Sequence, residues 1–273
     1  MKYRILVTLS LISCVLIFSG CNNTENIAVA DTWKINDPDR PQPPVITPGE
    51  NCGDAPSNAI ILFDGEDTSQ WHMTNGDPQP FLWKVEDGYM EVADLRDSEG
   101  KRILNSIRTN QSFGDCQLHV EWASPDKVEG QGQMRGNSGV YLMGMYEVQI
   151  LDSYNNTTYP DGQASAIYAQ NPPIFNVSRE PGQWQSYDIV FRRPRFDQDG
   201  ELTKPGYMTV FHNGVLVQDH FELKGMLIAE GEGPERVLKN KYNAHADKLP
   251  LVLQDHLNSV KFRNIWIIEL PEN

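Results

Sequence analysis

Two segments of this sequence place side chains capable of acid–base chemistry at every second position of an expected β-strand. Glu147 and Gln149 form the first pair, and Gln254 and His256 form the second. Because side chains of a β-strand alternate between its two faces, each pair lies on one face of its expected strand. A carboxylate, an imidazole and two amides on one surface can remove a proton, hold an oxyanion or bind a divalent metal.

A third segment adds a second carboxylate. In residues 118–122, Val120 and Trp122 take one face of the expected strand and Glu121 takes the other. We expect this strand to neighbour the other two, so that Glu121 and Glu147 converge on one polar surface. Two carboxylates, an imidazole and two amides would then form a single site.

Solvation alone also produces polar faces on a two-sheet protein. A solvated exterior is therefore the alternative for each of these pairs, and a lone histidine such as His256 is more often structural than catalytic. The combination of His, Glu and paired amides on three strands, with few Lys or Thr residues among them, favours a binding surface.

Strand-like patterns dominate the sequence from residue 58 onward. Short runs rich in Val, Ile, Tyr, Phe and Trp are separated by turn residues, and no amphipathic helix longer than a couple of turns is evident. We predict one all-β domain over residues 58–271, a two-sheet antiparallel jelly-roll sandwich. The clearest expected strands lie in residues 83–92, 118–122, 186–192, 208–218 (a hairpin around Asn-Gly) and 261–270, and residues 224–250 are expected to form a surface loop at the rim of a site.

The N-terminus is similar to a bacterial lipoprotein signal. Lys2 and Arg4 precede an apolar run over residues 5–18, and small residues then lead to Cys21. Cleavage would remove residues 1–20 and leave Cys21 to be lipidated, which predicts a chain anchored to a membrane rather than one that spans it. An ordinary secretory peptide with a coincidental cysteine is the alternative.

Residues 21–57 are rich in Asn, Asp and Pro, as expected of a flexible tether between lipid and domain. The signal and the tether together predict a location in the bacterial cell envelope, with the domain facing the periplasm or the cell surface. Asn22 provides no recognised retention signal, which favours the outer membrane over the inner one.

Charge and cysteine content limit the classes of molecule that this chain is expected to bind. The chain carries a net charge of −14, and removal of residues 1–20 takes away basic residues only, so nucleic acid and anionic lipid are poor partners, whereas neutral sugars are not excluded. Cys52 and Cys116 remain in the mature chain and either pair in an oxidising envelope or stay as free thiols. No Cys-x-x-Cys motif is present to indicate a redox or metal site.

Several motifs along the chain are jointly specific to one family. They are Leu62-Phe63-Asp64-Gly65 with Trp71, Asn137-Ser138-Gly139-Val140-Tyr141, residues 146–152, Ala166-Ile167-Tyr168, Asn213-Gly214, residues 253–256 and residues 260–266. In this order they resemble the 3-keto-disaccharide hydrolase domain family over residues 58–271. The resemblance implies a jelly-roll sandwich of the concanavalin A-like or laminin G-like type, in a secreted protein or a lipoprotein.

The resemblance also implies a reaction on a glycoside whose sugar carries a ketone at C3. The ketone acidifies the C2 proton, so a base can remove it, the group on C1 leaves by β-elimination, and water adds back. His256 or Glu147 would be the base, and Glu121 a further acid or a metal ligand. Substrate contacts would come from Asn137, Gln149 and Gln254, from Asp152 as a further acid or metal ligand, and from Tyr168 and Trp71 as stacking surfaces, although either aromatic residue is also compatible with the core.

Cofactor and partner expectations follow from the same reaction. No ligand-spacing motif demands a metal, although a divalent ion on the keto oxygen is compatible with the residues. The substrate would be an oligosaccharide or glycoside, and a sugar 3-oxidoreductase is a candidate partner that makes the ketone.

Two other functions remain open at this level. A retaining glycoside hydrolase of the same fold needs two carboxylates about 5 Å apart, yet Gln149 stands where a second acid would suit it. A non-catalytic sugar-binding module needs aromatic and amide side chains but no base, and a fold does not decide between the two.

Overall fold

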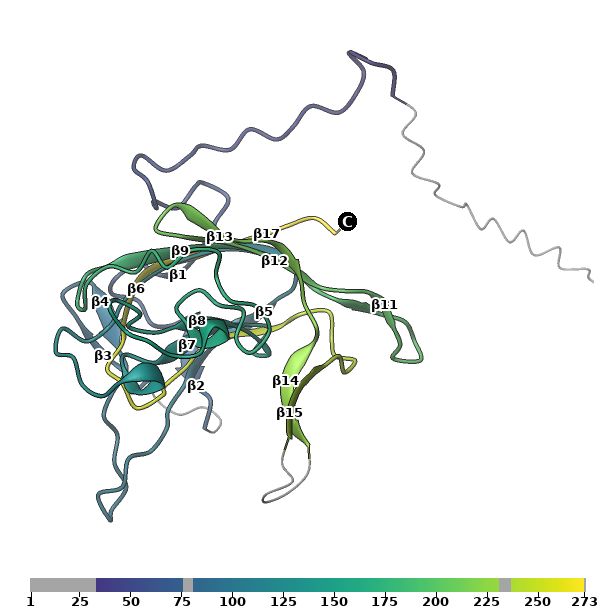
Figure 1. Ribbon diagram of the computed structural model, residues 1–273. Coiled ribbons are helices and arrows are strands. Elements are labelled where there is room, and N and C mark those ends of the chain that lie inside the picture. Colours follow the sequence, from purple (N-terminus) through teal and green to yellow (C-terminus); the bar gives the residue numbers. More distant parts are fainter. Residues whose placement is uncertain (1–32, 76–80, 231–236, 273) are drawn as a thin grey trace, which may run out of the picture. The chain divides into compact units, whose positions relative to one another are not determined.

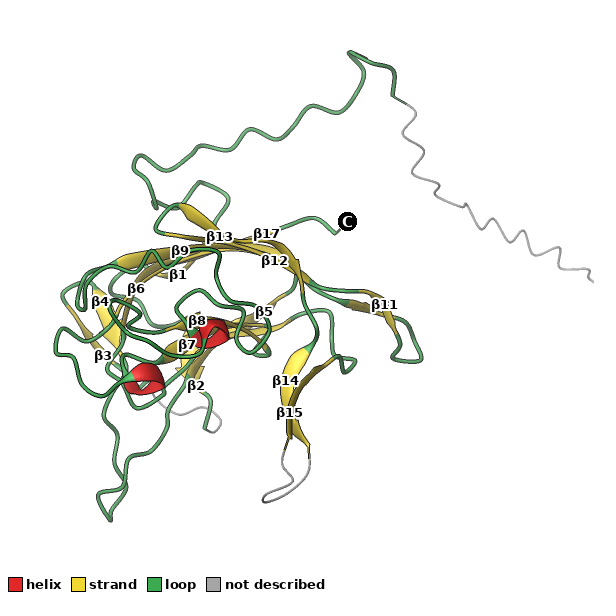
Figure 2. Cartoon of the chain, in the orientation of Figure 1, coloured by secondary structure: helices red, strands yellow, loops and turns green. Residues whose placement is uncertain are grey.

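Strands and turns make up nearly all of the described chain, residues 33–75, 81–230 and 237–272 of the computed structural model (Figure 2). This part holds seventeen strands, two 3-10 helices, η1 (Gly132–Met134) and η2 (Pro160–Gly162), and no α-helix. By its contacts the chain divides into Met1–Val45 and Ile46–Asn273. The predicted signal peptide and Cys21 lie outside the described residues. No helix in the described part is long and apolar enough to span a bilayer.

Two antiparallel sheets form the second unit and lie in layers (Figure 1). The larger has the order β13 (Val215–Glu222), β12 (Tyr207–His212), β9 (Gln185–Arg192), β6 (Cys116–Ala123), β17 (Lys261–Glu269), β4 (Tyr89–Glu91) and β3 (Lys84–Glu86), with β1 (Ile60–Phe63) also paired to β17. The smaller has the order β2 (Trp71–Met73), β5 (Ile107–Phe113), β16 (Leu249–Leu253), β7 (Ser138–Leu142) and β8 (Tyr146–Ile150). The predicted all-β, two-sheet antiparallel sandwich is confirmed.

The core lies between the inner faces of the two sheets. Strand β9 shows how the sequence specifies it, because Tyr187, Ile189 and Phe191 are fully buried while the residues between them are partly exposed. The Tyr146 ring of β8 lies 5.6 Å from the Phe191 ring, which joins the layers through aromatic contact. Burying one such side chain contributes roughly 1.5–3 kcal/mol to folding.

Two further hairpins extend from the sheets: β10 (Arg195–Phe196) with β11 (Leu202–Lys204), and β14 (Met226–Glu230) with β15 (Val237–Lys241). The second corrects the prediction of a loop over residues 224–250, which contains this hairpin and the start of β16. Its side chains are exposed or only partly buried, so the sequence lacks the apolar alternation that marks a half-buried strand.

Residues 46–57, assigned to the tether by their composition, belong to the same unit as the sandwich. The Gly53 carbonyl accepts hydrogen bonds from Asn264 Nδ2 and Trp266 Nε1, each at 2.9 Å. These contacts hold the segment against the outer face of the larger sheet. Cys52 and Cys116 are free cysteines, the first exposed and the second buried, so the structure contains no disulfide between them.

Candidate active site

The outer face of the smaller sheet carries the alternating polar residues predicted from the sequence. Glu147 lies opposite Tyr141, and Gln149 lies opposite Gly139, in the β7–β8 pairing. The Gln254 backbone N–H donates to the Gly139 carbonyl at 3.0 Å and continues the β16–β7 pairing beyond the end of β16. The strands bearing the two predicted pairs are therefore separated by β7 alone, which places them roughly 10 Å apart.

A cavity of about 70 Å³ opens on this face, and we call it the polar cavity. Six of its seven lining residues are predicted site residues, and the structure brings Glu147 and His256 to the same cavity. The lining residues are Asn137, Tyr141, Glu147, Gln149, Tyr168, Gln254 and His256.

Gly139 lies directly beneath two residues of the polar cavity, Glu147 and Tyr141, and has no side chain to keep them away. A Cβ atom there would lie 2.5 Å from Glu147 Oε1 and 2.8 Å from Tyr141 Cε2, both too close for real contacts. The carboxylate of Glu147 and the ring of Tyr141 thus lean over this glycine. Only glycine permits this arrangement at a β7 position whose φ is not positive.

Replacing Gly139 with Ala is expected to displace the Glu147 carboxylate and to destabilise the fold by about 1–3 kcal/mol, the usual cost of overpacking. Denaturant unfolding measures this loss. The double variant Gly139→Ala/Glu147→Ser, which shortens the clashing side chain, should recover part of the stability. Equal losses in the single and the double variant would contradict the proposed clash.

Burial sets the protonation of Glu147. Removal from water raises the pKa of this carboxyl to about 7, and a hydrogen bond from the Tyr141 hydroxyl, which acts in the opposite direction, does not offset it. Burial and the nearby Glu147 raise the pKa of Tyr141 far above its ordinary value, so its hydroxyl stays neutral. Gln254 Nε2 donates to the same hydroxyl at 3.0 Å. Glu147 can therefore both give and take a proton near neutral pH.

Two buried polar atoms of this region lack a hydrogen-bond partner within the described protein: Gln254 Oε1 and His256 Nδ1. A buried polar atom without a partner costs about 1–3 kcal/mol, so protein interiors seldom keep one without a role. Both belong to residues that line the polar cavity. A bound molecule with hydroxyl groups would satisfy them.

Amides line the other side of the polar cavity. Asn137 Nδ2 donates to the Gln133 carbonyl at 2.8 Å, and Gln149 Nε2 donates to Gln133 Oε1 at 3.1 Å. With its oxygen and nitrogen exchanged, the Gln149 amide instead donates to Glu147 Oε1 at 3.0 Å and to the Ser138 carbonyl at 3.2 Å. Gln149 is thus a second donor within reach of the Glu147 carboxylate.

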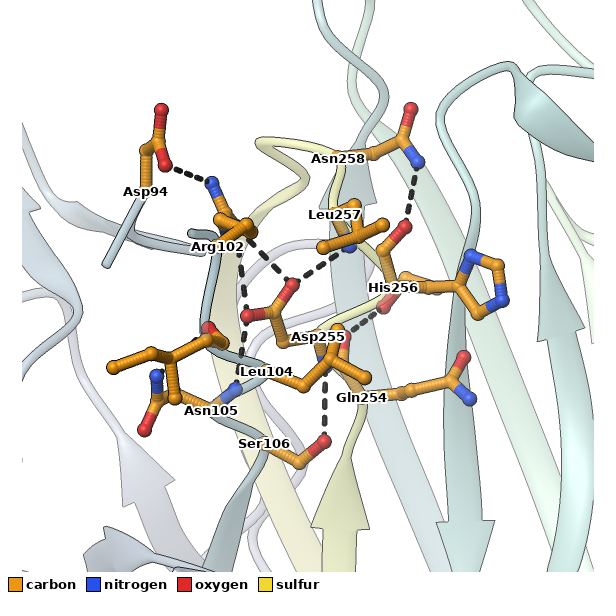
Figure 3. A network of polar contacts seen from close by, with 12 residues as sticks. Asp94, Arg102, Leu104, Asn105, Ser106, Gln254, Asp255, His256, Leu257 and Asn258 are labelled. Carbon is orange, nitrogen blue, oxygen red and sulfur yellow. Dashed lines mark hydrogen bonds and ion pairs between the residues drawn. The ribbon is translucent and has the colours of Figure 1, made fainter. Parts of the chain in front are cut away.

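The segment that follows β16 is held by Asp255, which points away from the polar cavity (Figure 3). Its carboxylate pairs with Arg102 at 3.2 Å and accepts from the backbone N–H groups of Asn105 at 2.9 Å and Leu257 at 2.8 Å. Figure 3 shows Gln254 and His256 extending to the opposite side. Asp255 is therefore a positioning residue for the two cavity residues that flank it.

Tyr168 stands at the boundary between the polar cavity and a second cavity of about 190 Å³. Its hydroxyl lies 2.8 Å from that of Tyr159, and its backbone N–H donates to the Glu147 carbonyl at 3.2 Å. We call the second space the apolar cavity. It is lined by Tyr141, Gly144, Met145, Glu147, Tyr168, Gln170, Met226 and Leu227.

Three predicted site residues lie elsewhere, the first being Trp71. Its side chain is 4% exposed in the core, and its Nε1 donates to the Leu62 carbonyl at 2.7 Å. Trp71 is therefore a packing residue and not a stacking surface for a ligand. Asp152 is also outside the polar cavity, because its carboxylate pairs with Arg135 in a separate cavity of about 500 Å³.

Glu121 is the third correction. Its strand, β6, belongs to the larger sheet, so its polar face lies on the opposite side of the sandwich from Glu147. There Glu121 Oε2 accepts from Arg263 Nε at 2.6 Å, and Glu121 Oε1 accepts from Asn264 Nδ2 at 2.9 Å. Burial raises the pKa of Glu121, but hydrogen bonds from its neighbours outweigh it and lower the pKa to about 2. A carboxylate held ionised in this way is structural.

His119 completes this second cluster. Burial lowers its pKa, but hydrogen bonds with Asp188, at 2.7 Å, and with Glu121 outweigh that effect and raise it to about 9. Its ring stacks on Trp266 with centroids 5.1 Å apart. A charged imidazole between two carboxylates stabilises this face of the sheet and the segment docked on it.

Asp188→Asn is expected to reduce the free energy of unfolding by about 1 kcal/mol at pH 6. Because the pKa of His119 is raised on folding, this stabilisation is complete below the unfolded value, about 6.5, and is lost as pH rises through 9. Urea unfolding at pH 6 and pH 10 tests it, with the exposed-turn variant Asp199→Asn as the control. A difference between wild type and Asp188→Asn that does not change with pH would contradict this role.

No role in the site was predicted for Gly139, Tyr141 or Gln133. Gly139 and Tyr141 carry a readable signal, because they belong to the motif of residues 137–141 and follow Asn137 at every second position, on the same face. Gln133 lies in η1, outside any strand pattern, and no sequence signal marks it.

Metal ligands are not gathered in the described part of the chain, where no group of three or more His, Cys, Asp or Glu side chains is arranged to hold an ion. Glu147 and His256 are the ionisable ligand types that line the polar cavity, apart from its tyrosines. The residues present therefore do not form a complete metal site there.

The described part of the chain is a two-sheet β-sandwich that carries amides, a carboxyl and an imidazole on an outer sheet face. Residues 58–268 match the model of the 3-keto-alpha-glucoside-1,2-lyase-like domain, and the chain belongs to this family. It is 41% identical to a "putative glycosyl hydrolase" of Parabacteroides distasonis, with a TM-score of 0.73, over 84% of this chain and 93% of that one.

A second solved structure carries the same description and comes from the same organism. It is 23% identical, with a TM-score of 0.51, over 78% of this chain and 95% of that one, and it supports the fold alone. Among curated proteins, none matches the chain.

Proposed function

We propose that this protein cleaves 3-keto-glycosides by removal of the C2 proton, elimination of the group on C1 and addition of water. The observation that carries the proposal is the meeting of Glu147 and His256 in one cavity, with polar atoms of Gln254 and His256 left without protein partners. A single strand, β7, separates the strands that carry the two residues, and family membership supports a carbohydrate substrate.

In the elimination half, His256 takes the C2 proton, and the electron pair moves onto the C3 oxygen as an enolate. The enolate then reforms the ketone, the C1–O bond breaks, and a C1=C2 double bond forms. Glu147, protonated in part at neutral pH because burial raises its pKa to about 7, gives its proton to the departing oxygen.

In the hydration half, the roles reverse. The Glu147 carboxylate takes a proton from water as the hydroxyl adds to C1, and the His256 imidazolium returns a proton to C2. The sum is one glycoside and one water giving a free 3-keto sugar and an alcohol. Both residues end in their starting protonation states.

Gln254 is the amide with an N–H group available to the enolate. Its Nε2 makes a single hydrogen bond, to Tyr141, whereas the N–H groups of Asn137 and Gln149 donate to Gln133 and Asn137. A fixed donor aimed at a developing oxyanion contributes roughly 3–4 kcal/mol in acyl-transfer enzymes. A two-carboxylate glycosidase is not supported, because Glu147 is the one carboxylate that lines the polar cavity.

The experiment offers a 3-keto-disaccharide and its parent disaccharide to the purified, unlipidated domain. Release of the leaving sugar from the keto substrate alone is the expected result. Cleavage of the parent sugar would favour a classical glycosidase, and binding without turnover of either would favour a sugar-binding module. Addition and removal of divalent metal ions tests the metal requirement in the same assay.

We further propose that Cys21 is lipidated and anchors the protein in the bacterial cell envelope, at the outer membrane. An enzyme that oxidises a glycoside at C3 must supply the substrate, since the ketone is the group that acidifies C2. Mass spectrometry of the mature N-terminus, beside the Cys21→Ala variant, tests the anchor.

A further inference from the structure

Glu147 and the rings of Tyr141 and Tyr168 stand between two cavities of opposite chemical character. The polar cavity on one side is lined by amides and His256. The apolar cavity on the other side is lined beyond this border by Gly144, Met145, Gln170, Met226 and Leu227. A molecule that fills both would cross the border beside the Glu147 carboxyl.

Gln170 is the polar side chain of the apolar cavity beyond the border, and both ends of its amide are occupied. Its Nε2 donates to the Gly225 carbonyl at 2.9 Å, and its Oε1 accepts from the Lys224 backbone N–H at 2.7 Å. The remaining wall is made of methionine and leucine side chains. Beyond the border, the wall of this cavity is thus richer in apolar side chains than the wall of the polar cavity.

The β14–β15 hairpin supplies part of this wall. Met226 and Leu227 begin β14, and both are partly buried. Asn240 of β15 donates through Nδ2 to the Ala169 carbonyl at 2.8 Å, next to Tyr168. The hairpin base is thus fixed to the segment that carries the border tyrosine, so the apolar wall is held in place relative to Glu147.

We propose that the apolar cavity receives the leaving group of the glycoside, and that this group is aromatic or otherwise apolar rather than a second sugar. The inference rests on the proposed function, which puts the scissile C1–O bond beside Glu147. The sugar ring then lies over the polar cavity with its polar groups directed into it, and the atoms attached to its C1 oxygen extend past the border.

Three physical arguments favour an aromatic group. A second sugar would lose hydrogen bonds from its hydroxyls to water and gain few from this wall, which is unfavourable. A cavity of about 150 Å³ with apolar walls accepts a benzene-sized ring, so a space of about 190 Å³ has suitable dimensions. Methionine sulfur, supplied by Met145 and Met226, contacts aromatic rings favourably.

The test compares kcat/KM for a 3-keto phenyl glucoside and a 3-keto-disaccharide. Phenol is the better leaving group by itself, so the decisive quantity is the effect of a variant on each substrate. Leu227→Asn should lower kcat/KM for the phenyl substrate about tenfold, the lower end for a pocket contact, and change the disaccharide value less than twofold. Leu238→Asn, on the exposed part of the same hairpin, should change neither.

Equal losses on both substrates, or no loss on the phenyl substrate, would overturn the proposal. Met226→Gln provides a second variant with the same expected pattern if Leu227→Asn does not fold. Calorimetric binding of unoxidised phenyl glucoside separates the two proposals. If the wild type binds phenyl glucoside and Leu227→Asn binds it about tenfold more weakly, the proposed role of the apolar cavity is supported even if no keto substrate is turned over. If the wild type does not bind phenyl glucoside, the proposed role is overturned.

Discussion

Replacement of Glu147 by Gln is expected to lower turnover of a 3-keto-glycoside by about 10²- to 10⁴-fold, the usual contribution of a general acid–base group. The amide keeps the size of the side chain and can still accept from Tyr141, but it can neither donate an acidic proton to the leaving oxygen nor take one from water. The same substitution should stabilise the fold at alkaline pH.

The stability effect follows from the direction of the pKa shift. The folded-state pKa of Glu147 is raised from 4.5 to about 7, so the folded state binds the proton more tightly than the unfolded state does. Stability from this group is complete below pH 4.5 and is lost as pH rises through 7. At pH 8 the wild type therefore carries a buried charge that Glu147→Gln lacks, worth about 3 kcal/mol.

Denaturant unfolding of wild type and Glu147→Gln at pH 5 and pH 8, beside turnover assays, measures both effects. Glu222→Gln is a matched control, because Glu222 also accepts from a tyrosine hydroxyl, that of Tyr207 at 3.0 Å, but on the exposed surface. It should change neither activity nor stability appreciably. Full activity in Glu147→Gln would remove Glu147 from the mechanism.

The second large effect is expected for His256→Ala, with a loss of about 10²- to 10⁴-fold in kcat. The His256 ring makes no hydrogen bond within the described protein, and its buried Nδ1 lacks a partner, so its removal should cost little stability. Free imidazole should restore part of the activity by entering the space that the side chain vacates. A purely structural histidine would show neither the rescue nor the preserved stability.

His119→Gln is the matched comparison, and we expect it to have the opposite effects on stability and on kcat. His119 is 2% exposed and bonded to Asp188, on the sheet that does not carry the polar cavity. Its replacement should reduce stability and leave kcat unchanged. If both histidine variants lost activity in proportion to stability, the assignment of His256 as the base would be wrong.

The alternation of side chains along a strand was sufficient to predict which residues share a face. Glu147 and Gln149 share one face, as do Gln254 and His256, because the period of two is a local property of the chain. The all-β fold followed from the same local patterns. The Asn-Gly hairpin at residues 213–214, between β12 and β13, is another example.

Neighbour relations between strands were not predictable in the same way. The sequence places Glu121 on a polar face as correctly as it places Glu147, yet β6 is paired with β9 and β17 in the other sheet. Sheet order depends on contacts distant in sequence, and the alternation pattern is identical for either sheet. Asp152 illustrates the same limit, since only the fold brings Arg135 to its carboxylate.

Gly139 shows a further limit of sequence patterns. A glycine within a strand signals a close approach of some kind, but the partner that approaches is visible only in the structure. Here it is the Glu147 carboxylate, whose burial and raised pKa depend on that missing side chain.

The most direct test of the central claim is one turnover of a 3-keto-glycoside in D₂O, with the product examined by NMR. The proton that His256 takes from C2 exchanges with solvent on the imidazolium before a proton is returned to C2, so we predict a product with deuterium at C2 and protium at C4. Spontaneous exchange next to the ketone would label both positions and is measured with the product alone. A product that keeps its original proton at C2 would contradict the elimination mechanism.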